Sequence, residues 1–435
     1  MSNSNTLIGN ETEQIGLKTR AEKTKLIAAA GVGNFLEIFD FTVYSFFAAI
    51  IGRVFFPSDN PLVSLLIAVS VFGVGFIMRP LGSILIGAYA DRKGRKSAML
   101  LTIMLMAAGS ALIGFAPTYE MIGWAAPLLI VLGRLLQGFS AGGEIGAATT
   151  LLMESAGKNE RGFFVSWQFI GQGLSSMCGA LFGAGLTYFL SEEALHSWGW
   201  RVPFIFALLI IPVGLYIRAH INETFVGAEH DDASGVTNPV KELLTTHFRQ
   251  FIIAIFMVMP MTLLMYIMVF YMPTYLKEIT EMDATMSYMI SAATSIVMII
   301  FALLAGIICD RINKRKPLAL AIIAVSLVAS WLSFQLVTQF WPFFISLLVT
   351  IAALGALLTT GLLIIMEAFP RSVRASATAM TYGIGVTIFG GTAQIVVTWL
   401  LEITNKNPMA PFWYLGVMLV IAFIAYALFK EERYI

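Results

Sequence analysis

GAYADRKGRK, residues 87–96, is the segment of this 435-residue chain from which its fold can be worked out. It sets Asp91 and four basic residues between two long apolar runs, in a chain that is only 12% charged and 58% hydrophobic. Such a composition is far more apolar than that of soluble domains and indicates a membrane protein. The formal net charge of +1 gives no basic face for nucleic acid, which we exclude as a partner.

Apolar stretches recur along the whole chain, and about 20 residues suffice to cross a bilayer as a helix. We therefore expect an all-α membrane protein with twelve transmembrane helices, the first of them an uncleaved anchor because no small-residue cleavage site follows a short apolar core. The expected spans lie near residues 26–51, 62–88, 97–116, 121–153, 162–190, 201–219, 249–275, 285–308, 317–337, 341–367, 376–402 and 410–429.

The placement of basic residues predicts the orientation, because Lys and Arg near the ends of spans are retained in the cytoplasm. With the N-terminus inside, the outer loops hold only Arg53, Arg201, Lys277 and Lys406 of the 27 basic residues. Twelve spans then place both termini in the cytoplasm.

The opening segment has a counterpart in the second half of the chain. GIICDRINKRK follows the eighth span and sets Gly306 and Asp310 219 residues after Gly87 and Asp91. This repeat predicts duplicated six-helix units, which in two-lobed transporters enclose a substrate site at the membrane midplane.

A second repeat joins the ends of the fourth and tenth spans. MESAGKNERG carries Glu154 and Arg161, and MEAFPRSVRA carries Glu367 and Arg374 213 residues later. We predict two pseudo-symmetric six-helix lobes joined by a cytoplasmic linker. The expected divisions are a cytoplasmic tail at 1–25, an N-terminal lobe at 26–219, the linker at 220–248, a C-terminal lobe at 249–429 and a cytoplasmic end at 430–435.

These segments resemble the signature of the major facilitator superfamily, and GRLLQGFSAGGE (133–144) resembles the motif of its fourth span. GNFLEIFDF (33–41), FIMRPLG (76–82), WGWRVPF (198–204) and INETF (221–225) are similar to its metabolite:proton symporter family, with carriers of the citrate/tricarballylate, alpha-ketoglutarate and proline/betaine types. The resemblance implies a secondary transporter of the bacterial inner membrane rather than an enzyme. Tyr89 stands where leucine is usual, and Asn313 replaces the glycine of the second signature.

The same resemblance implies that GAYADRKGRK is a loop between spans two and three that gates the transporter. Asp91 can meet basic groups or a helix N-terminus of the other lobe, and Arg92 and Arg95 can meet carboxylates. The alternative for a single Lys or Arg is a plain orientation anchor. The expected gating residues are Gly87, Asp91, Arg92, Gly94, Arg95, Glu154, Arg161, Gly306, Asp310, Arg311, Arg315, Glu367 and Arg374.

Few ionisable residues fall inside the spans, where a charge is costly unless it is paired or faces a wet cavity. Asn34, Glu37, Asp40 and Tyr44 are three or four residues apart and share a helix face, with Asp40 about 22 Å from Lys25 along the axis. Desolvation favours the protonated form of a carboxyl group. We therefore expect Glu37 and Asp40 to couple transport to protons, unless they form fixed ion pairs with arginine.

Glu144 is a third candidate for proton coupling. It lies seven residues after Gln137 on the same helix face, although it can instead support packing around Gly142 and Gly143.

Arg79 and Arg134 are the complementary charges, and their planar guanidinium groups match a carboxylate. An ionised acid would occupy the arginine, and its protonation would free the arginine for an anionic substrate. Arg79 adjoins Pro80 and can instead stabilise a helix kink, and the tyrosines can be ordinary packing residues. The expected substrate-binding residues are Asn34, Tyr44, Arg79, Arg134, Gln137, Gln168, Gln172, Tyr266 and Tyr382.

We expect proton-coupled import of a small organic acid, a citrate-like tricarboxylate or a dicarboxylate, because SWQFIGQG (166–173) looks more like the tricarboxylate carriers. The alternative substrate is a zwitterionic osmolyte such as proline or betaine, and a drug exporter or a non-transporting sensor is less favoured. No phosphate-binding loop is present, since Leu152 stands where the sole Gly-Lys pair would require glycine. We expect no cofactor or metal, and a carrier that acts as a monomer in the lipid bilayer.

Overall fold

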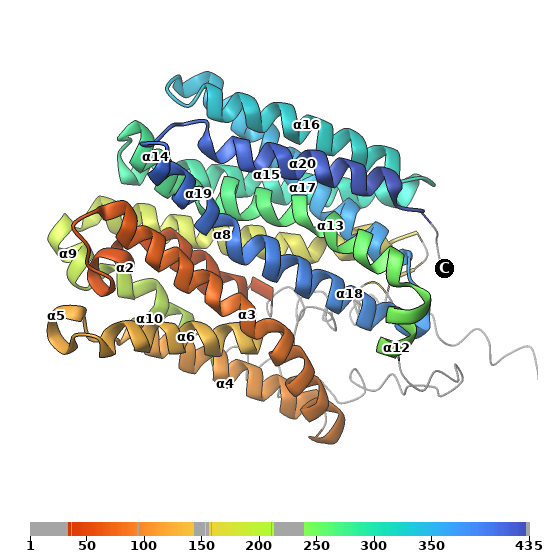
Figure 1. Cartoon of the computed structure of the whole chain (residues 1–435), viewed down its shortest axis with the longest axis horizontal. Coiled ribbons are helices and arrows are strands. Elements are labelled where there is room, and N and C mark those ends of the chain that lie inside the picture. Colours follow the sequence, from red (N-terminus) through yellow and green to blue (C-terminus); the bar gives the residue numbers. More distant parts are fainter. Residues whose placement is uncertain are drawn as a thin grey trace, which may run out of the picture.

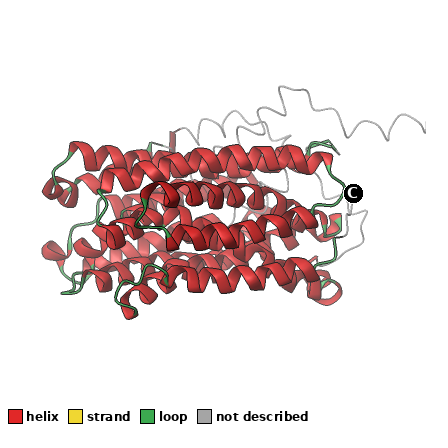
Figure 2. Ribbon diagram, turned by 90° about the horizontal axis from the view of Figure 1, so that it is seen from above, coloured by secondary structure: helices red, strands yellow, loops and turns green. Residues whose placement is uncertain are grey.

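The computed structural model describes residues 34–35, 37–93, 95–142, 153, 156–157, 159–209, 211–212 and 239–431. Within these ranges the regular structure is helical, without a strand. Most of the helices run side by side along one direction, so the molecule has two ends at which chain segments turn back (Figure 2).

The described helices account for the twelve predicted spans. Nine of them are long and apolar enough to cross a membrane, and the bent pair Glu37–Phe46 and Ala48–Phe55 adds a tenth. Two shorter apolar helices, Leu100–Gly114 and Gly199–Leu208, lie where spans three and six were expected. The prediction of an all-α, twelve-helix membrane architecture is confirmed.

The helices of the first half, up to residue 208, begin with Glu37–Phe46. They continue with α2 (Ala48–Phe55), α3 (Pro61–Lys93), α4 (Arg95–Gly114), α5 (Tyr119–Ile122), α6 (Ala125–Gly142), α8 (Arg161–Phe189), α9 (Glu192–Ser197), the 3-10 helix η1 (Gly199–Arg201) and α10 (Val202–Leu208).

After α12 (Pro239–Thr246), the helices of the second half begin at residue 248. They are α13 (Phe248–Leu264), η4 (Met265–Phe270), α14 (Met272–Thr280), α15 (Ala284–Arg311), α16 (Lys316–Gln335), α17 (Phe340–Glu367), α18 (Arg371–Gly385), η5 (Val386–Gly390), α19 (Gly391–Ile403) and α20 (Ala410–Leu428).

The two halves of the sequence occupy different sides of the molecule, as the colours of Figure 1 show. They meet along two helix pairs, α8 with α15 and α3 with α19. Much of the expected linker at 220–248 lies outside the described residues, so the domain boundaries remain a prediction.

Glycine allows the halves to approach closely where these helices cross. A Cβ on Gly306 would lie 2.6 Å from the carbonyl oxygen of Gly162, and a Cβ on Gly73 would lie 2.5 Å from that of Gly391. Small residues serve the same purpose at helix crossings in membranes generally. Both crossings join the first half to the second, so their glycines determine how near the halves can come.

The segment GAYADRKGRK is not the loop that the resemblance implied. α3 continues through the charged residues to Lys93, and α4 begins at Arg95. No proline or glycine interrupts the sequence between Ala88 and Lys93, so the backbone keeps its internal hydrogen bonds beyond the apolar run. Gly94 lies outside the described residues.

Two π-helical segments interrupt the second half. η4 follows α13 directly, and its wider turn is completed by a hydrogen bond from the Tyr271 N–H to the Tyr266 carbonyl oxygen at 3.1 Å. η5 lies between α18 and α19. Such segments are rare and often mark functional sites, and both contribute residues to the cavity described next.

Candidate functional site

A small cavity lies where the two halves meet at mid-depth. Its walls come from both halves and include four predicted substrate-binding residues, Arg79, Gln172, Tyr266 and Tyr382. The free volume is about 20 Å³, enough for about one water molecule. An organic acid with several carboxyl groups is larger than this, so the halves must separate before such a ligand can enter.

Arg79 carries the positive charge of the cavity wall. It is 3% exposed, and its Nη2 lies 3.7 Å from Glu37 Oε1. The guanidinium carbon also lies 4.7 Å from the ring centre of Phe41 and 4.5 Å from that of Phe76. This separation from Glu37 is longer than a hydrogen bond, so the two groups attract each other without being locked together.

Arg134 lies inside the first half, behind the cavity wall, and is fully buried. Its guanidinium carbon lies 4.5 Å from the ring centre of Phe41, 4.6 Å from that of Tyr44 and 4.9 Å from that of Phe72. Phe41 therefore contacts both buried arginines, Arg79 and Arg134. Aromatic faces attract guanidinium groups but accept no conventional hydrogen bond.

A chain of hydrogen bonds connects Arg134 to Asp40. Arg134 Nη1 donates to Gln137 Oε1 at 2.7 Å, and Gln137 Nε2 donates to Ser110 Oγ at 3.1 Å. Ser110 Oγ donates to Asp40 Oδ2 at 2.7 Å. Asp40 and Arg134, which were expected to pair, are thus connected by hydrogen bonds through Ser110 and Gln137. The described residues show no direct ion pair between them.

Asn34 and Tyr44, two predicted residues of the first helix, bond to two different neighbouring helices. Asn34 and Gln168 form a reciprocal amide pair, with Asn34 Nδ2 2.6 Å from the Gln168 carbonyl oxygen and Gln168 Nε2 2.9 Å from Asn34 Oδ1. Tyr44 donates its hydroxyl to the Ala68 carbonyl oxygen at 3.2 Å. These contacts tie the first helix to α8 and α3.

Contacts across the cavity join the halves near Tyr382 and Tyr266. Tyr382 and Gln172 of α8 line the cavity from different halves. Gln394 Nε2 lies 2.6 Å from Ser45 Oγ and 3.4 Å from the Tyr266 carbonyl oxygen. Ser45, like Ser110, was not among the predicted site residues, because an uncharged serine in an apolar helix gives no signal in a sequence.

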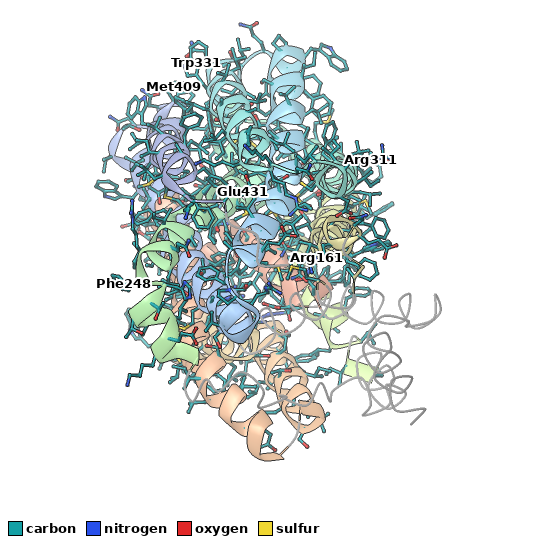
Figure 3. The ribbon with its side chains drawn as sticks, turned by 90° about the vertical axis from the view of Figure 1, so that its right-hand side faces the viewer. Arg161, Phe248, Arg311, Trp331, Met409 and Glu431 are labelled. Atoms are coloured by element: carbon teal, nitrogen blue, oxygen red, sulfur yellow. The ribbon has the colours of Figure 1, made fainter. Side chains whose placement is uncertain are left out.

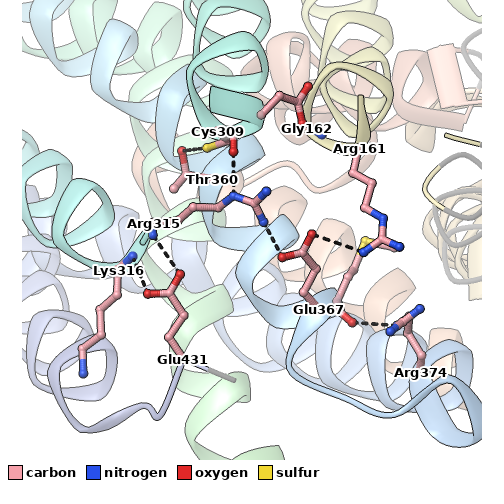
Figure 4. Close-up of polar contacts among 11 residues, drawn as sticks. Arg161, Gly162, Cys309, Arg315, Lys316, Thr360, Glu367, Arg374 and Glu431 are labelled. Atoms are coloured by element: carbon pink, nitrogen blue, oxygen red, sulfur yellow. Dashed lines mark hydrogen bonds and ion pairs between the residues drawn. The ribbon is translucent and has the colours of Figure 1, made fainter. Parts of the chain in front are cut away.

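At one end of the bundle, called the basic end here, Glu367 bridges the two halves (Figure 4). Its carboxylate accepts a hydrogen bond from Arg315 of the same half and lies 3.7 Å from Arg161 of the other half. Arg374 donates from Nε to the Met366 carbonyl oxygen at 3.0 Å. All four side chains are largely buried.

Asp310 makes a second connection between the halves at the basic end, which faces the viewer in Figure 3. Its Oδ1 accepts from the Gly162 N–H at 2.7 Å, and its Oδ2 from the Phe163 N–H at 2.9 Å. These are unpaired donors at the start of α8, where the helix dipole also favours a negative charge. Arg311, next to Asp310, is exposed and lines a cleft between α8 and α15.

The opposite end is joined by contacts of a different kind. The Tyr288 hydroxyl donates to the Phe46 carbonyl oxygen at 2.8 Å, and Thr187 Oγ1 lies 3.0 Å from Thr285 Oγ1. The halves therefore touch at both ends of the molecule, on either side of the central cavity.

Some predicted residues cannot be placed. Glu144, Glu154 and Gly94 lie outside the described residues. Four more predicted gating residues belong to helices, but their side chains are not described. They are Gly87, Asp91, Arg92 and Arg95.

Two repeated halves around a central cavity, with buried ionisable groups at mid-depth, are typical of a secondary transporter. The comparisons with known proteins agree with this class. The model of the Major Facilitator Superfamily matches residues 30–385 and, in a second alignment, residues 276–434. The chain belongs to the Major Facilitator Superfamily, as its motifs predicted, and it is a transporter and not an enzyme.

Two curated relatives have different substrates in their names. A citrate-proton symporter from Klebsiella pneumoniae is 34% identical over 387 residues, covering 88% of this chain and 86% of the relative. A glycine betaine/proline/ectoine/pipecolic acid transporter from Dickeya dadantii is 33% identical over 423 residues, covering 94% and 83%.

Solved structures share the fold at lower identity. The E. coli xylose transporter XylE, in a partially occluded inward-open conformation, aligns with a TM-score of 0.74 and 15% identity. The alignment covers 94% of this chain and all of that one. This likeness bears on the fold alone.

Proposed function

We propose that this protein is a proton-coupled symporter that imports a small organic acid, a citrate-like tricarboxylate or a dicarboxylate, by alternating access. One observation carries the choice of an acid. Nε and Nη2 of both Arg79 and Arg134 are buried and donate no hydrogen bond to a described group. Unpaired buried donors are costly, and a substrate carboxylate is the natural acceptor for them.

The charge balance at mid-depth supports an anion as the substrate. The described charged groups there are Arg79, Arg134, Glu37 and Asp40, which sum to zero when both carboxyl groups are ionised. Protonation of both leaves two positive charges, which match an incoming dianion. The symported protons would thus prepare the site for the substrate, because two uncompensated charges are costly at this depth.

Arg79 is the residue that we assign to the first substrate carboxylate, because it lines the cavity. While Glu37 is ionised it attracts Arg79 across 3.7 Å. Protonation of Glu37 removes that attraction, and a carboxylate can then take both free donors of the guanidinium fork. Competition for one arginine couples proton binding and substrate binding without any covalent step.

A zwitterionic osmolyte remains the second candidate, because one curated relative transports betaine and proline. A quaternary ammonium group is usually held against open aromatic faces. In the first half the rings of Phe41, Phe72 and Phe76 are already in contact with guanidinium groups. That arrangement favours the organic acid.

We further propose that the carrier acts as a monomer in the bacterial inner membrane with both termini in the cytoplasm. The basic end, where α3, α8 and α15 carry the signature residues, then faces the cytoplasm, in accordance with the distribution of Lys and Arg.

The proposal is tested by uptake into proteoliposomes with an imposed inward proton gradient. Labelled citrate, succinate, proline and betaine are compared in the same preparation. We expect accumulation of citrate or succinate that a protonophore abolishes, and a loss of at least tenfold in their apparent affinity in Arg79→Lys, because lysine cannot form the bidentate pair. Accumulation of betaine or proline alone would replace the organic acid by the osmolyte.

A further inference from the structure

Ser110, near the end of α4, lies where the acidic and basic parts of the buried network meet. Its Oγ lies 2.7 Å from Asp40 Oδ2, 3.1 Å from Gln137 Nε2 and 3.0 Å from the Met106 carbonyl oxygen. The side chain is 1% exposed, so water does not replace these partners. The hydroxyl group has one proton and two acceptors within reach, Asp40 and Met106.

While Asp40 is ionised, the chemistry of the groups fixes the direction of each hydrogen bond in the chain. A guanidinium group only donates, so Gln137 must accept through its oxygen and donate through its nitrogen. Ser110 therefore accepts from Gln137 and is left to donate to Asp40. Every donor points from Arg134 toward Asp40, which is the polarity that stabilises a carboxylate at the far end.

We propose that Ser110 is a positioning residue for proton coupling, which holds Asp40 in its ionised form and transmits its protonation to Gln137 and Arg134. This rests on the proton-coupled function proposed above. When a hydronium ion gives its proton to Asp40 Oδ2 and leaves as water, the new O–H donates to Ser110 Oγ, and the Ser110 hydroxyl turns to the Met106 carbonyl oxygen. Release of the proton to water reverses both changes, and no other covalent bond is altered.

The rearrangement reaches Arg134 through the oxygen of Ser110, which has two acceptor lone pairs. In the protonated state this oxygen accepts from Asp40 as well as from Gln137, so the bond from Gln137 weakens. The amide of Gln137 and the guanidinium group that it holds then become free to reorient. A merely structural serine would bond the carbonyl oxygen four residues back and have no such effect.

The charged and titratable surroundings of Asp40 are few among the described residues. Arg134 of α6 is near enough to attract the Asp40 carboxylate from a neighbouring helix, without a direct ion pair. The groups that in turn face Arg134 or lie beside it are Tyr44 of the first helix, Arg79 of α3, Tyr266 of η4 and, through Arg79, Glu37.

Ser140 provides a matched control. It lies on α6 and is 1% exposed, and its hydroxyl donates to the Thr102 carbonyl oxygen of α4 at 2.7 Å. Ser140→Ala therefore removes one buried hydrogen bond between the same two helices as Ser110→Ala does. It leaves the chain from Arg134 to Asp40 unchanged.

The test is an infrared titration of the purified carrier in liposomes, which needs no substrate. The C=O stretching band of protonated Asp40 is identified by its absence in Asp40→Asn. In Ser110→Ala we expect the midpoint of this band to rise by about one pH unit, a tenfold change in proton affinity, because the carboxylate loses a charge-assisted hydrogen bond. Ser140→Ala should titrate as the wild type does, and Ser110→Thr, which keeps the hydroxyl, should restore the wild-type midpoint.

The outcomes separate this inference from the proposed function. Equal midpoints in Ser110→Ala and Ser140→Ala, in a carrier whose uptake still follows the proton gradient, would overturn the role of Ser110 alone. If no band is lost in Asp40→Asn, then Asp40 does not titrate, and the inference is wrong. Proton-independent uptake by the wild type would instead remove the proposed function.

Discussion

Asp310→Asn tests the connection between the halves at the basic end, because this carboxylate of α15 receives two backbone N–H groups at the start of α8. Asparagine keeps one neutral acceptor but loses the charge and the second acceptor. Hydrogen bonds to charged groups contribute about 1.5–3 kcal/mol when buried. Asp310 is half-buried, so we take about 1.5 kcal/mol as the loss, which is about tenfold in the population of conformers open at this end.

The assay is double electron–electron resonance between spin labels at Asn159 and Asn313, which line the cleft at the basic end from different halves. Cys178 and Cys309 are both free and are first replaced by alanine. Asp283→Asn is the control, because Asp283 caps the start of the same helix within one half, accepting from the Met286 N–H at 3.2 Å.

We expect a longer-distance population in Asp310→Asn that is about tenfold enriched, and an unchanged distribution in Asp283→Asn. The reasoning is refuted if Asp310→Asn keeps the wild-type distribution, or if the control lengthens the distance equally.

Three further predictions follow from single contacts. Gly306→Ala places a Cβ 2.6 Å from the Gly162 carbonyl oxygen, so the same spin-label pair should show loss of the closed population, whereas alanine at Gly185, which has open space around it, should not. Glu431→Gln weakens the hydrogen bonds that Glu431 accepts from the Arg315 and Lys316 N–H groups at 2.8 and 3.2 Å. We expect a loss of about 1 kcal/mol, seen as a fall of a few degrees in the melting temperature of the purified protein, and an unchanged melting temperature would contradict it. Tyr382→Phe removes a hydroxyl group from the cavity wall and should raise the KM for the transported acid several-fold; an unchanged KM would exclude the hydroxyl from substrate binding.

The fold was predictable because its determinants are local or repeated. Apolar length alone predicts the spans, and the repeated signatures at Asp91 and Asp310 reveal the duplication. The extension of α3 through the charged segment was not predicted. The family resemblance implied a loop there, whereas α3 continues because the sequence from Ala88 to Lys93 holds neither glycine nor proline.

The candidate site was only partly accessible from the sequence. Charged residues such as Asp40 and Arg134 stand out in an apolar chain because membranes exclude unpaired charge. Ser110 does not stand out, since a buried serine in a helix commonly bonds its own backbone. Its role depends on the position of α4, which places Ser110 between Asp40 and Gln137. That position results from the packing of the helices and cannot be deduced from the sequence.

The aromatic rings that contact the two arginines could not be predicted from the sequence either. Phe41 contacts both Arg79 and Arg134, yet phenylalanine is too common in this chain for any one ring to signal a site. Pairing of Asn34 with Gln168 likewise required the arrangement of the first helix against α8.

The most direct test of the account compares exchange with accumulation in Asp40→Asn. Proteoliposomes are loaded with unlabelled substrate for exchange, or given an inward proton gradient for accumulation, and labelled citrate is followed in both. The account predicts that gradient-driven accumulation disappears while exchange of solute for solute remains measurable. Continued concentration of the substrate by Asp40→Asn would contradict it and place proton coupling on another residue.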